Sequence, residues 1–523
     1  MKRLLLGPIV GHTDEQSSRI WIRVLDDPGL YRLRVLGAGT VPFMSTEGGP
    51  IEFGTAIAQI QGLRADREYR YQVLRRGRAV PGSRGSFRTM PAPGSLAELQ
   101  FVFISCNHQQ EEGIWRQLKT FIDDSKPRFL LMMGDQVYVD QNGDVWKSHL
   151  DRPPAGRRQA LAQKYQDNWS REPLREIMAN IPVYMTWDDH EIRDGWGSWA
   201  PDSPTMAARY PRGESIYARH AAYFGDARDV YWHFQMAHNP PVDPPAPGER
   251  KAMPFTFSCG RLSVLVLDSR GERDIWREGH PVLGQEQWQF IDDVVANLSA
   301  ETDVLAIVTP TPIATMSPKS IAQFSADQLE HLAPDVRLFR RGDARRLGNL
   351  INEGGTGLPG ETRAGEGLNK ILGKSVFKIR AKIDEVRDQW SHHFSRPEQA
   401  ALIRKAGAAR TSRRTSHTPR EVIFLGGDIH MGGSFEITVS DPAFQALCLV
   451  SSGISQAADK AIDSLVTVDE SFEVAPGIRC KQRELVQDYN FGVVQIIPTG
   501  GRPEIVPAIV HSRTSASAVL QIG

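Results

Sequence analysis

The stretch RFLLMMGDQVYVD (128–140) decides the fold class of this chain. An apolar run of strand length ends at Gly134, where the backbone can turn sharply, and Asp135, Tyr138 and Asp140 follow. Five other segments have the same form: LQFVFISC (99–106), PVYMTWDDHE (182–191), RLSVLVLDSR (261–270), DVLAIVTPTP (303–312) and REVIFLGGDIH (420–430). Continuous apolar runs are typical of strands buried on both faces, and helical stretches such as 286–299 lie between several of them. The pattern predicts an α/β fold whose site lies beyond the carboxyl ends of the strands.

The composition is that of a globular protein with several domains. The chain has 523 residues, 40% hydrophobic and 24% charged, with a formal net charge of zero. A balanced charge gives no strong signal for nucleic acid, and no apolar run reaches the ~20 residues of a membrane span. The apolar stretch near the N-terminus is broken by Gly7 and Pro8 and lacks a cleavage site or twin-arginine pair. We therefore expect a first strand there, no leader, and a cytoplasmic location.

Residues 1–90 are expected to form a small β-sandwich. SRIWIRV (18–24), GLYRLRVLGA (29–38) and REYRYQVL (67–74) alternate apolar and polar residues between turn residues. Tyr69 lies just before a strand, where its hydroxyl could bond back to the backbone as a tyrosine corner. Residues 91–98 have the composition of a linker, and 99–523 form the second domain.

The polar strand ends of the second domain carry residues of ligand type. Parallel strands would bring them to one rim, where packed carboxylates repel each other unless a cation neutralises them. Mixed oxygen, nitrogen and sulfur donors suit a transition-metal pair with a harder, oxygen-bound ion. Taken singly, a Gly-Asp pair is usually a capped turn, DDH is often a solvated loop, and a lone His is usually structural. The joint occurrence favours metal, through Cys106, Asn107, His108, Asp135, Tyr138, Asp188, Asp189, His190, Asp194, Asp428 and His430.

At these residues the chain resembles a known family. GD-x-x-Y, then N/D-H-E, then G-H/D-x-H is the order of motifs in calcineurin-like metallophosphoesterases. The forms SCN, GDQVYVD, TWDDHEIRDGW, LDSR and GGDIH are similar to the alkaline phosphatase D (PhoD-like) family. The segment from LLLGPIVGH to GSFRT resembles that family's N-terminal immunoglobulin-like domain. The resemblance implies a four-layer αββα metallophosphoesterase sandwich preceded by an immunoglobulin- or fibronectin-like β-sandwich.

The resemblance also implies roles for individual residues. Cys106 and Tyr138 would ligate a ferric ion, Asp135 would bridge two metals, and Asp189 would be a further ligand. Asp428 and His430 would each ligate one metal, with Asn107, His108, Asp188 and Asp194 as further candidates. The second ion would be Ca²⁺, or another divalent ion such as Mn²⁺ or Zn²⁺. His190 would contact phosphate and protonate the leaving oxygen. Arg193 or Arg270 would hold a non-bridging oxygen, or else form a structural ion pair.

The implied activity is hydrolysis of a small phosphate ester by a metal-bound hydroxide. Phosphomonoesters and phosphodiesters both stay open as substrates. The alternative is a non-catalytic metal- or ligand-binding protein derived from this fold. Members of the family are generally exported, in contrast to the cytoplasmic location that the N-terminus suggests.

The segment at about 316–420 is expected to be a basic, partly helical insertion. Lys370, Lys374, Lys378 and Lys382 fall on one line at i, i+4 spacing, opposite an apolar stripe. Three interpretations stay open for this helix: a packed helix with a solvated lysine face, a lid that gathers anionic substrate, or a helix in weak contact with anionic surfaces.

Overall fold

The computed structural model describes most of the chain. The described residues are 4–47, 52–108, 112–141, 144–150, 152–198, 216–244, 246, 249–275, 279, 281–321, 387–413, 418–457, 470–499 and 501–514. Among them, no helix has the length and apolar character needed to cross a bilayer.

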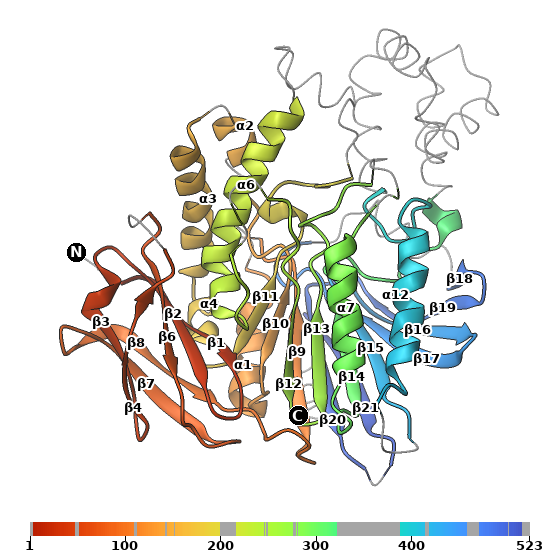
Figure 1. The fold of residues 1–523 in the computed structure, drawn as a ribbon, viewed down its shortest axis with the longest axis horizontal. Coiled ribbons are helices and arrows are strands. Elements are labelled where there is room, and N and C mark those ends of the chain that lie inside the picture. The colour runs from red at the N-terminus through yellow and green to blue at the C-terminus, as the bar shows by residue number, and fades with distance from the viewer. Residues whose placement is uncertain are drawn as a thin grey trace.

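The N-terminal part is a sandwich of two four-stranded antiparallel sheets, at the red end of Figure 1. The strands are β1 (Leu4–Thr13), β2 (Ser18–Val24), β3 (Tyr31–Val35), β4 (Gly39–Pro42), β5 (Met44–Ser45), β6 (Thr55–Ile60), β7 (Glu68–Arg75) and β8 (Arg78–Arg88), with a 3-10 turn at Pro28–Leu30. Buried residues of both sheets form one core, for example Ile20 and Ala58 against Leu33 and Val73. The Tyr69 hydroxyl accepts the backbone N–H of Arg64 at 2.9 Å, as the tyrosine corner predicts.

The second domain contains two larger sheets. The five-stranded sheet has the order β11-β10-β9-β20-β21, and the eight-stranded sheet has the order β12-β13-β14-β15-β17-β16-β19-β18. The first consists of β9 (Leu99–Ile104), β10 (Leu130–Met133), β11 (Val183–Thr186), β20 (Asn490–Ile497) and β21 (Glu504–His511). The second consists of β12 (Phe255–Cys259), β13 (Leu262–Val266), β14 (Val304–Val308), β15 (Glu421–Gly426), β16 (Gly432–Ser440), β17 (Ala443–Val450), β18 (Ser471–Ala475) and β19 (Ile478–Val486). Strands β9, β10 and β11 run parallel, as do β13, β14, β15 and β17.

Helices cover the outer faces of both sheets (Figure 1). On the side of the five-stranded sheet lie α1 (Trp115–Ser125), α2 (Val145–His149), α3 (Pro154–Trp169), α4 (Leu174–Met178) and α6 (Ile216–Phe234). Helices α7 (Gln285–Asn297) and α12 (Arg396–Ala409) lie over the eight-stranded sheet. Short 3-10 helices span Asp189–Glu191 and Met236–His238. The result is the αββα arrangement that the family resemblance implies.

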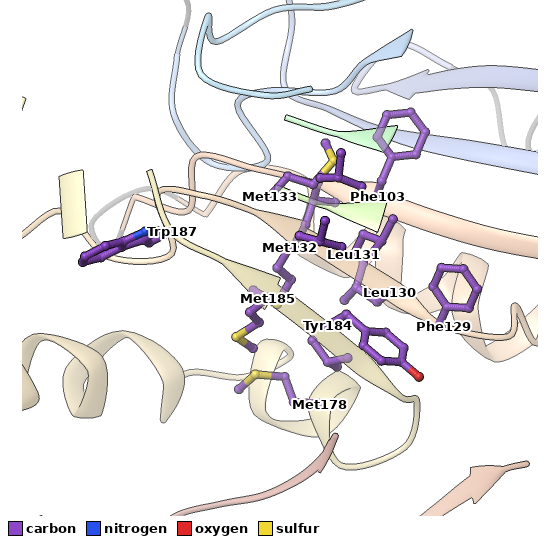
Figure 2. Packing of buried hydrophobic residues seen from close by; sticks show 14 of the residues in the cluster. Phe103, Phe129, Leu130, Leu131, Met132, Met133, Met178, Tyr184, Met185 and Trp187 are labelled. Atoms are coloured by element: carbon purple, nitrogen blue, oxygen red, sulfur yellow. The ribbon is translucent and has the colours of Figure 1, made fainter. Parts of the chain in front are cut away.

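The side chains of β14 show why the sequence produces these layers. Val304, Ala306 and Val308 belong to the core between the two sheets, whereas Leu305 and Ile307 belong to the core under α7 and α12. Successive side chains of a strand point to opposite faces, so a strand buried on both sides must be apolar throughout. Figure 2 shows part of the first of these cores around β10 and β11, where Leu130, Met132, Met185 and Tyr184 lie among other apolar side chains.

The sandwich is attached to the second domain through polar contacts at the edge of an apolar interface. The Trp21 indole donates to the carbonyl oxygen of His233 at 2.9 Å, and the Tyr184 hydroxyl donates to that of Thr13 at 3.0 Å. The Tyr71 hydroxyl donates to the Ala179 carbonyl oxygen at 2.8 Å. These bonds fix the sandwich on β11, α4 and α6.

The segment expected as an insertion is described only at its ends. The four lysines of the predicted stripe lie outside the described residues. At the C-terminal end, α12 packs its buried Leu402 and Ile403 into the core under the eight-stranded sheet. This part of the 316–420 range therefore belongs to the body of the domain.

We predict that Gly11→Ala destabilises the docked sandwich. A Cβ at Gly11 would lie 2.2 Å from the carbonyl oxygen of His238, which is backbone and cannot rotate away. Overpacking of this kind costs ~1–3 kcal/mol. The control is Gly225→Ala in α6, where an added Cβ meets nothing within 4 Å. This substitution should stabilise the protein by ~0.5–1 kcal/mol, because alanine favours a helix more than glycine does. Urea unfolding measures both, and equal midpoint shifts would contradict the prediction.

Candidate metal centre

The candidate ligands lie in loops that directly follow β9, β10, β11 and β15. Four of them adopt left-handed backbone conformations, with φ of 58° at Cys106, 56° at Asp135, 64° at Asp428 and 56° at His430. Non-glycine residues rarely adopt such values, and they are concentrated at functional sites where the surrounding structure holds them. The turns aim these side chains away from the strand direction and toward one another.

Glycines allow the loops to approach closely. At Gly134, φ is 94°, and a Cβ there would lie 2.5 Å from the Cβ of Asp188. At Gly427, a Cβ would lie 2.3 Å from the hydroxyl oxygen of Ser105. Loops from neighbouring strands and from the two sheets therefore meet in a space that side chains at these positions would fill.

One group of candidate ligands contains sulfur, phenol, carboxylate and imidazole. Cys106 Sγ, a carboxylate oxygen of Asp135 and a ring nitrogen of His430 lie within 4.8 Å of one another. The Cys106 thiol donates to Asp135 Oδ2 at 3.4 Å, and the Tyr138 hydroxyl donates to the same oxygen at 3.3 Å. The Tyr138 hydroxyl oxygen is also 3.2 Å from His430 Nε2. The structure thus brings His430 beside Cys106, Asp135 and Tyr138, the three residues that the resemblance assigns to the ferric ion, and their role as ligands stays a prediction.

Two further groups lie beside the first: one consists of carboxylates alone, and the other contains Asp135, which also belongs to the first group. Oxygen atoms of Asp188, Asp189 and Asp428 lie within 4.8 Å of one another, and so do ligand atoms of Asp135, Asp189 and His190. Asp189 belongs to both of these sets. The overlap of these groups is compatible with more than one ion, and a bridging role for Asp135 stays a prediction.

Burial makes this arrangement unfavourable without a cation. Burial and then the neighbouring Cys106 raise the pKa of Asp135 well above its usual range. Burial and Asp189 raise the pKa of Asp428 to about 7. Oδ2 of Asp188 and Oδ1 of Asp189 are buried with no hydrogen-bond partner in the described part of the chain. Bound cations would neutralise the carboxylates and coordinate these oxygens, so the residues present fit a metal centre.

His190 stands beside the ligands and is oriented by Asp140. Its Nδ1 lies 2.8 Å and 3.0 Å from the two carboxylate oxygens of Asp140. Burial lowers the pKa of His190, but Asp140, Asp189 and Asp135 together raise it well above its usual value. Its ring centroid lies 4.2 Å from that of Tyr138. Sequence reasoning noted Asp140 close to the motif but gave it no role.

The remaining candidates lie around the centre. Asn107 is buried and donates its amide to the Gln136 carbonyl oxygen at 3.5 Å. The His108 ring packs edge-on against Tyr138, with centroids 5.2 Å apart. Neither His108 nor Asp194 belongs to the groups of converging ligand atoms among the described residues. Their role as ligands stays a prediction.

Both arginines are buried against other side chains, unlike an exposed arginine that extends from the surface toward a phosphate. Arg193 is 3% exposed, and its guanidinium carbon lies 4.8 Å from the ring centroid of Trp146. Arg270 is fully buried and bonded to Asp188 and Asp388. This geometry favours the ion-pair interpretation for Arg270, and contact with phosphate stays a prediction for both residues.

Glu191 is a residue that sequence reasoning left without a role. Its carboxylate accepts the backbone N–H groups of Asp135, Gln136 and Asp188, at 3.0, 2.7 and 3.0 Å. The only available signal was its position directly after the DDH triplet.

Comparison with known proteins agrees with this geometry. The family model described as PhoD-like phosphatase matches residues 101–499. The chain belongs to the PhoD-like phosphatase family. It is 26% identical over 273 residues to alkaline phosphatase D of Bacillus subtilis (strain 168), a match that spans 47% of this chain and 43% of that protein.

Solved structures support the fold. A structure of PhoD superimposes with a TM-score of 0.60 at 16% identity, over 98% of this chain and 89% of that one. A purple acid phosphatase from yellow lupin seeds superimposes with a TM-score of 0.50 at 11% identity, over 97% and 72%. Both similarities show the metallophosphoesterase fold. At these identities they show the fold alone, and the activity depends on the residues of the site.

We predict that Asp135→Asn and Asp189→Asn purify with less bound metal than the wild type. Each change removes a charged ligand oxygen from a position shared by two groups of candidate ligands. Asp140→Asn is the matched control, because its carboxylate faces His190 and should leave metal content unchanged. Elemental analysis of the purified proteins measures the difference. Wild-type metal content in Asp135→Asn would refute the assignment.

Proposed function

We propose that this protein is a metal-dependent phosphoesterase. The observation that carries the proposal is the convergence of two adjoining ligand groups, centred on Asp135 and Asp189, beside a histidine paired with a carboxylate. Bound metal ions would supply an activated water and positive charge for the phosphoryl oxygens. Family membership and the related alkaline phosphatase D support the reaction class.

His190 is the residue that moves a proton in this proposal. A carboxylate only accepts hydrogen bonds, so the proton on Nδ1 points to Asp140 and the second ring nitrogen, Nε2, is left for the substrate. The pair with Asp140 favours the imidazolium, which can donate from Nε2 to the leaving oxygen of an ester. Asp140 thus holds the ring in the orientation and protonation state that the step needs.

The two ligand groups suit different ions. Cys106 and Tyr138 offer thiolate and phenolate, which favour ferric iron, whereas the carboxylates of Asp188, Asp189 and Asp428 favour Ca²⁺ or Mn²⁺. The substrate is a small phosphate ester. Assays with aryl phosphate monoesters and diesters decide between the two classes.

We predict that Tyr138→Phe loses a visible absorption band. A phenolate bound to ferric iron gives charge transfer in the visible range, and phenylalanine has no oxygen to bind the ion. The variant should also contain less iron. Tyr165→Phe is a suitable control, since its buried hydroxyl bonds Gln235 instead of the ligand groups. A Tyr138→Phe protein with the wild-type band and iron content would contradict the ferric assignment.

We predict that His190→Ala keeps its metal and loses turnover by ~10²–10³-fold, the usual cost of removing one group that stabilises developing charge. Hydrolysis of aryl phosphate monoesters and diesters measures this loss, with metal content determined on the same samples. Chelator treatment of the wild type should abolish hydrolysis, and added Mn²⁺ or Ca²⁺ with iron should restore it. A wild-type protein that binds metal but hydrolyses neither ester class would favour the non-catalytic alternative.

A further inference from the structure

Residues 387–392, here called the clamp segment, lie next to the metal centre although they are distant from it in sequence. Trp390 is 1% exposed, and its indole donates to the Thr311 carbonyl oxygen at 3.2 Å. The Ser391 hydroxyl donates to the Met316 carbonyl oxygen at 2.6 Å. The clamp segment is therefore anchored on the loop that follows β14.

This anchoring places two side chains of the clamp segment against the candidate ligands. The Gln389 amide donates to Asp428 Oδ2 at 3.0 Å. Asp388, which is 4% exposed, accepts Nη1 and Nη2 of Arg270 at 2.7 and 2.6 Å, a two-pronged ion pair. Gln389 thus contacts the candidate ligand Asp428 directly. Asp388 contacts a different candidate ligand, Asp188, through Arg270.

Arg270 connects Asp388 to the acidic group. Its Nε donates to Asp188 Oδ1, and its Nη2 lies 3.8 Å from Asp189 Oδ1. A buried guanidinium at this position competes with a cation for the same carboxylates. Asp388 is the charged partner of Nη1 and Nη2 and offsets the charge of the guanidinium. The same nitrogens also donate to the Trp196 carbonyl oxygen at 3.0 Å and the Thr311 hydroxyl at 3.3 Å.

We propose that Asp388 and Gln389 are positioning residues of the metal centre: Asp388 holds Arg270 away from Asp189, and Gln389 orients Asp428. The segment tunes the affinity of the carboxylate-rich ion site and leaves the Cys106–Tyr138 site unchanged. The inference rests on the metal binding that underlies the proposed function and does not depend on turnover. Normal Mn²⁺ binding without hydrolysis would defeat the proposed function and leave this inference standing.

The test measures Mn²⁺ affinity of the iron-loaded protein by electron paramagnetic resonance of the free ion. Asp388→Asn should weaken Mn²⁺ binding by ~10–100-fold, the usual effect of residues that orient metal ligands. Gln389→Leu, which removes the amide donor to Asp428 and leaves the Arg270–Asp388 ion pair intact, should also weaken Mn²⁺ binding. Iron content and the visible band should match the wild type in both variants.

Two further variants separate positioning from general stability. Asp226→Asn also removes the partner of a buried arginine, Arg157, and Asp226 belongs to none of the converging ligand groups among the described residues, so Mn²⁺ affinity should be unchanged. In an Arg270→Gln background, Asp388→Asn should have little further effect on Mn²⁺ affinity, because Asp388 acts through Arg270. Additive losses in the double variant, or wild-type affinity in Gln389→Leu and Asp388→Asn, would overturn the proposal. If Asp388→Asn does not fold, wild-type affinity in Gln389→Leu alone overturns it.

Discussion

The carboxylate of Glu191 is the contact on which the geometry of the site depends. It accepts backbone N–H groups from the loop after β10 and from the loop after β11, and also the Gln235 amide of the segment after α6 at 3.0 Å. Burial raises the pKa of Glu191 to about 7, although its N–H donors stabilise the charged form. A single side chain thus sets the spacing between Asp135 and Asp189, and the loops carry their ligands at a fixed separation.

The candidate ligands are brought together in two ways, by the arrangement of the strands and by the local backbone conformation of the loops. Parallel pairing brings the ends of β9, β10 and β11 to one edge of the five-stranded sheet. Packing of the two sheets brings the loop after β15 beside them, so that Asp428 lies near Asp188 and Asp189. Left-handed turns at residues such as Cys106 and Asp428 then direct the side chains inward. Both the strand arrangement and the left-handed turns are needed to bring the ligand atoms together, because without the turns the side chains would continue along the strand directions.

Sequence reasoning predicted what local patterns encode and missed what depends on distant contacts. The apolar runs predicted the strands. The tyrosine corner was predicted from a place just before a strand, and the structure has Tyr69 as the second residue of β7, with the expected bond to the Arg64 N–H. The motifs named Asp135, Asp189 and Asp428, and the structure brings them together. Asp388 escaped notice because it lies 118 residues from Arg270 in a segment that is basic by composition. Pairings of that kind come from the tertiary fold and leave no periodic signal.

Ile321 and Trp390 lie far apart in the sequence and are buried in the same core cluster. Residues that are distant in the chain must be brought together before their contact stabilises the fold, and this search slows folding. The core under the eight-stranded sheet is therefore expected to be completed late in folding. Until it is complete, the apolar faces of β14 and β15 that pack there stay exposed to other unfolded chains.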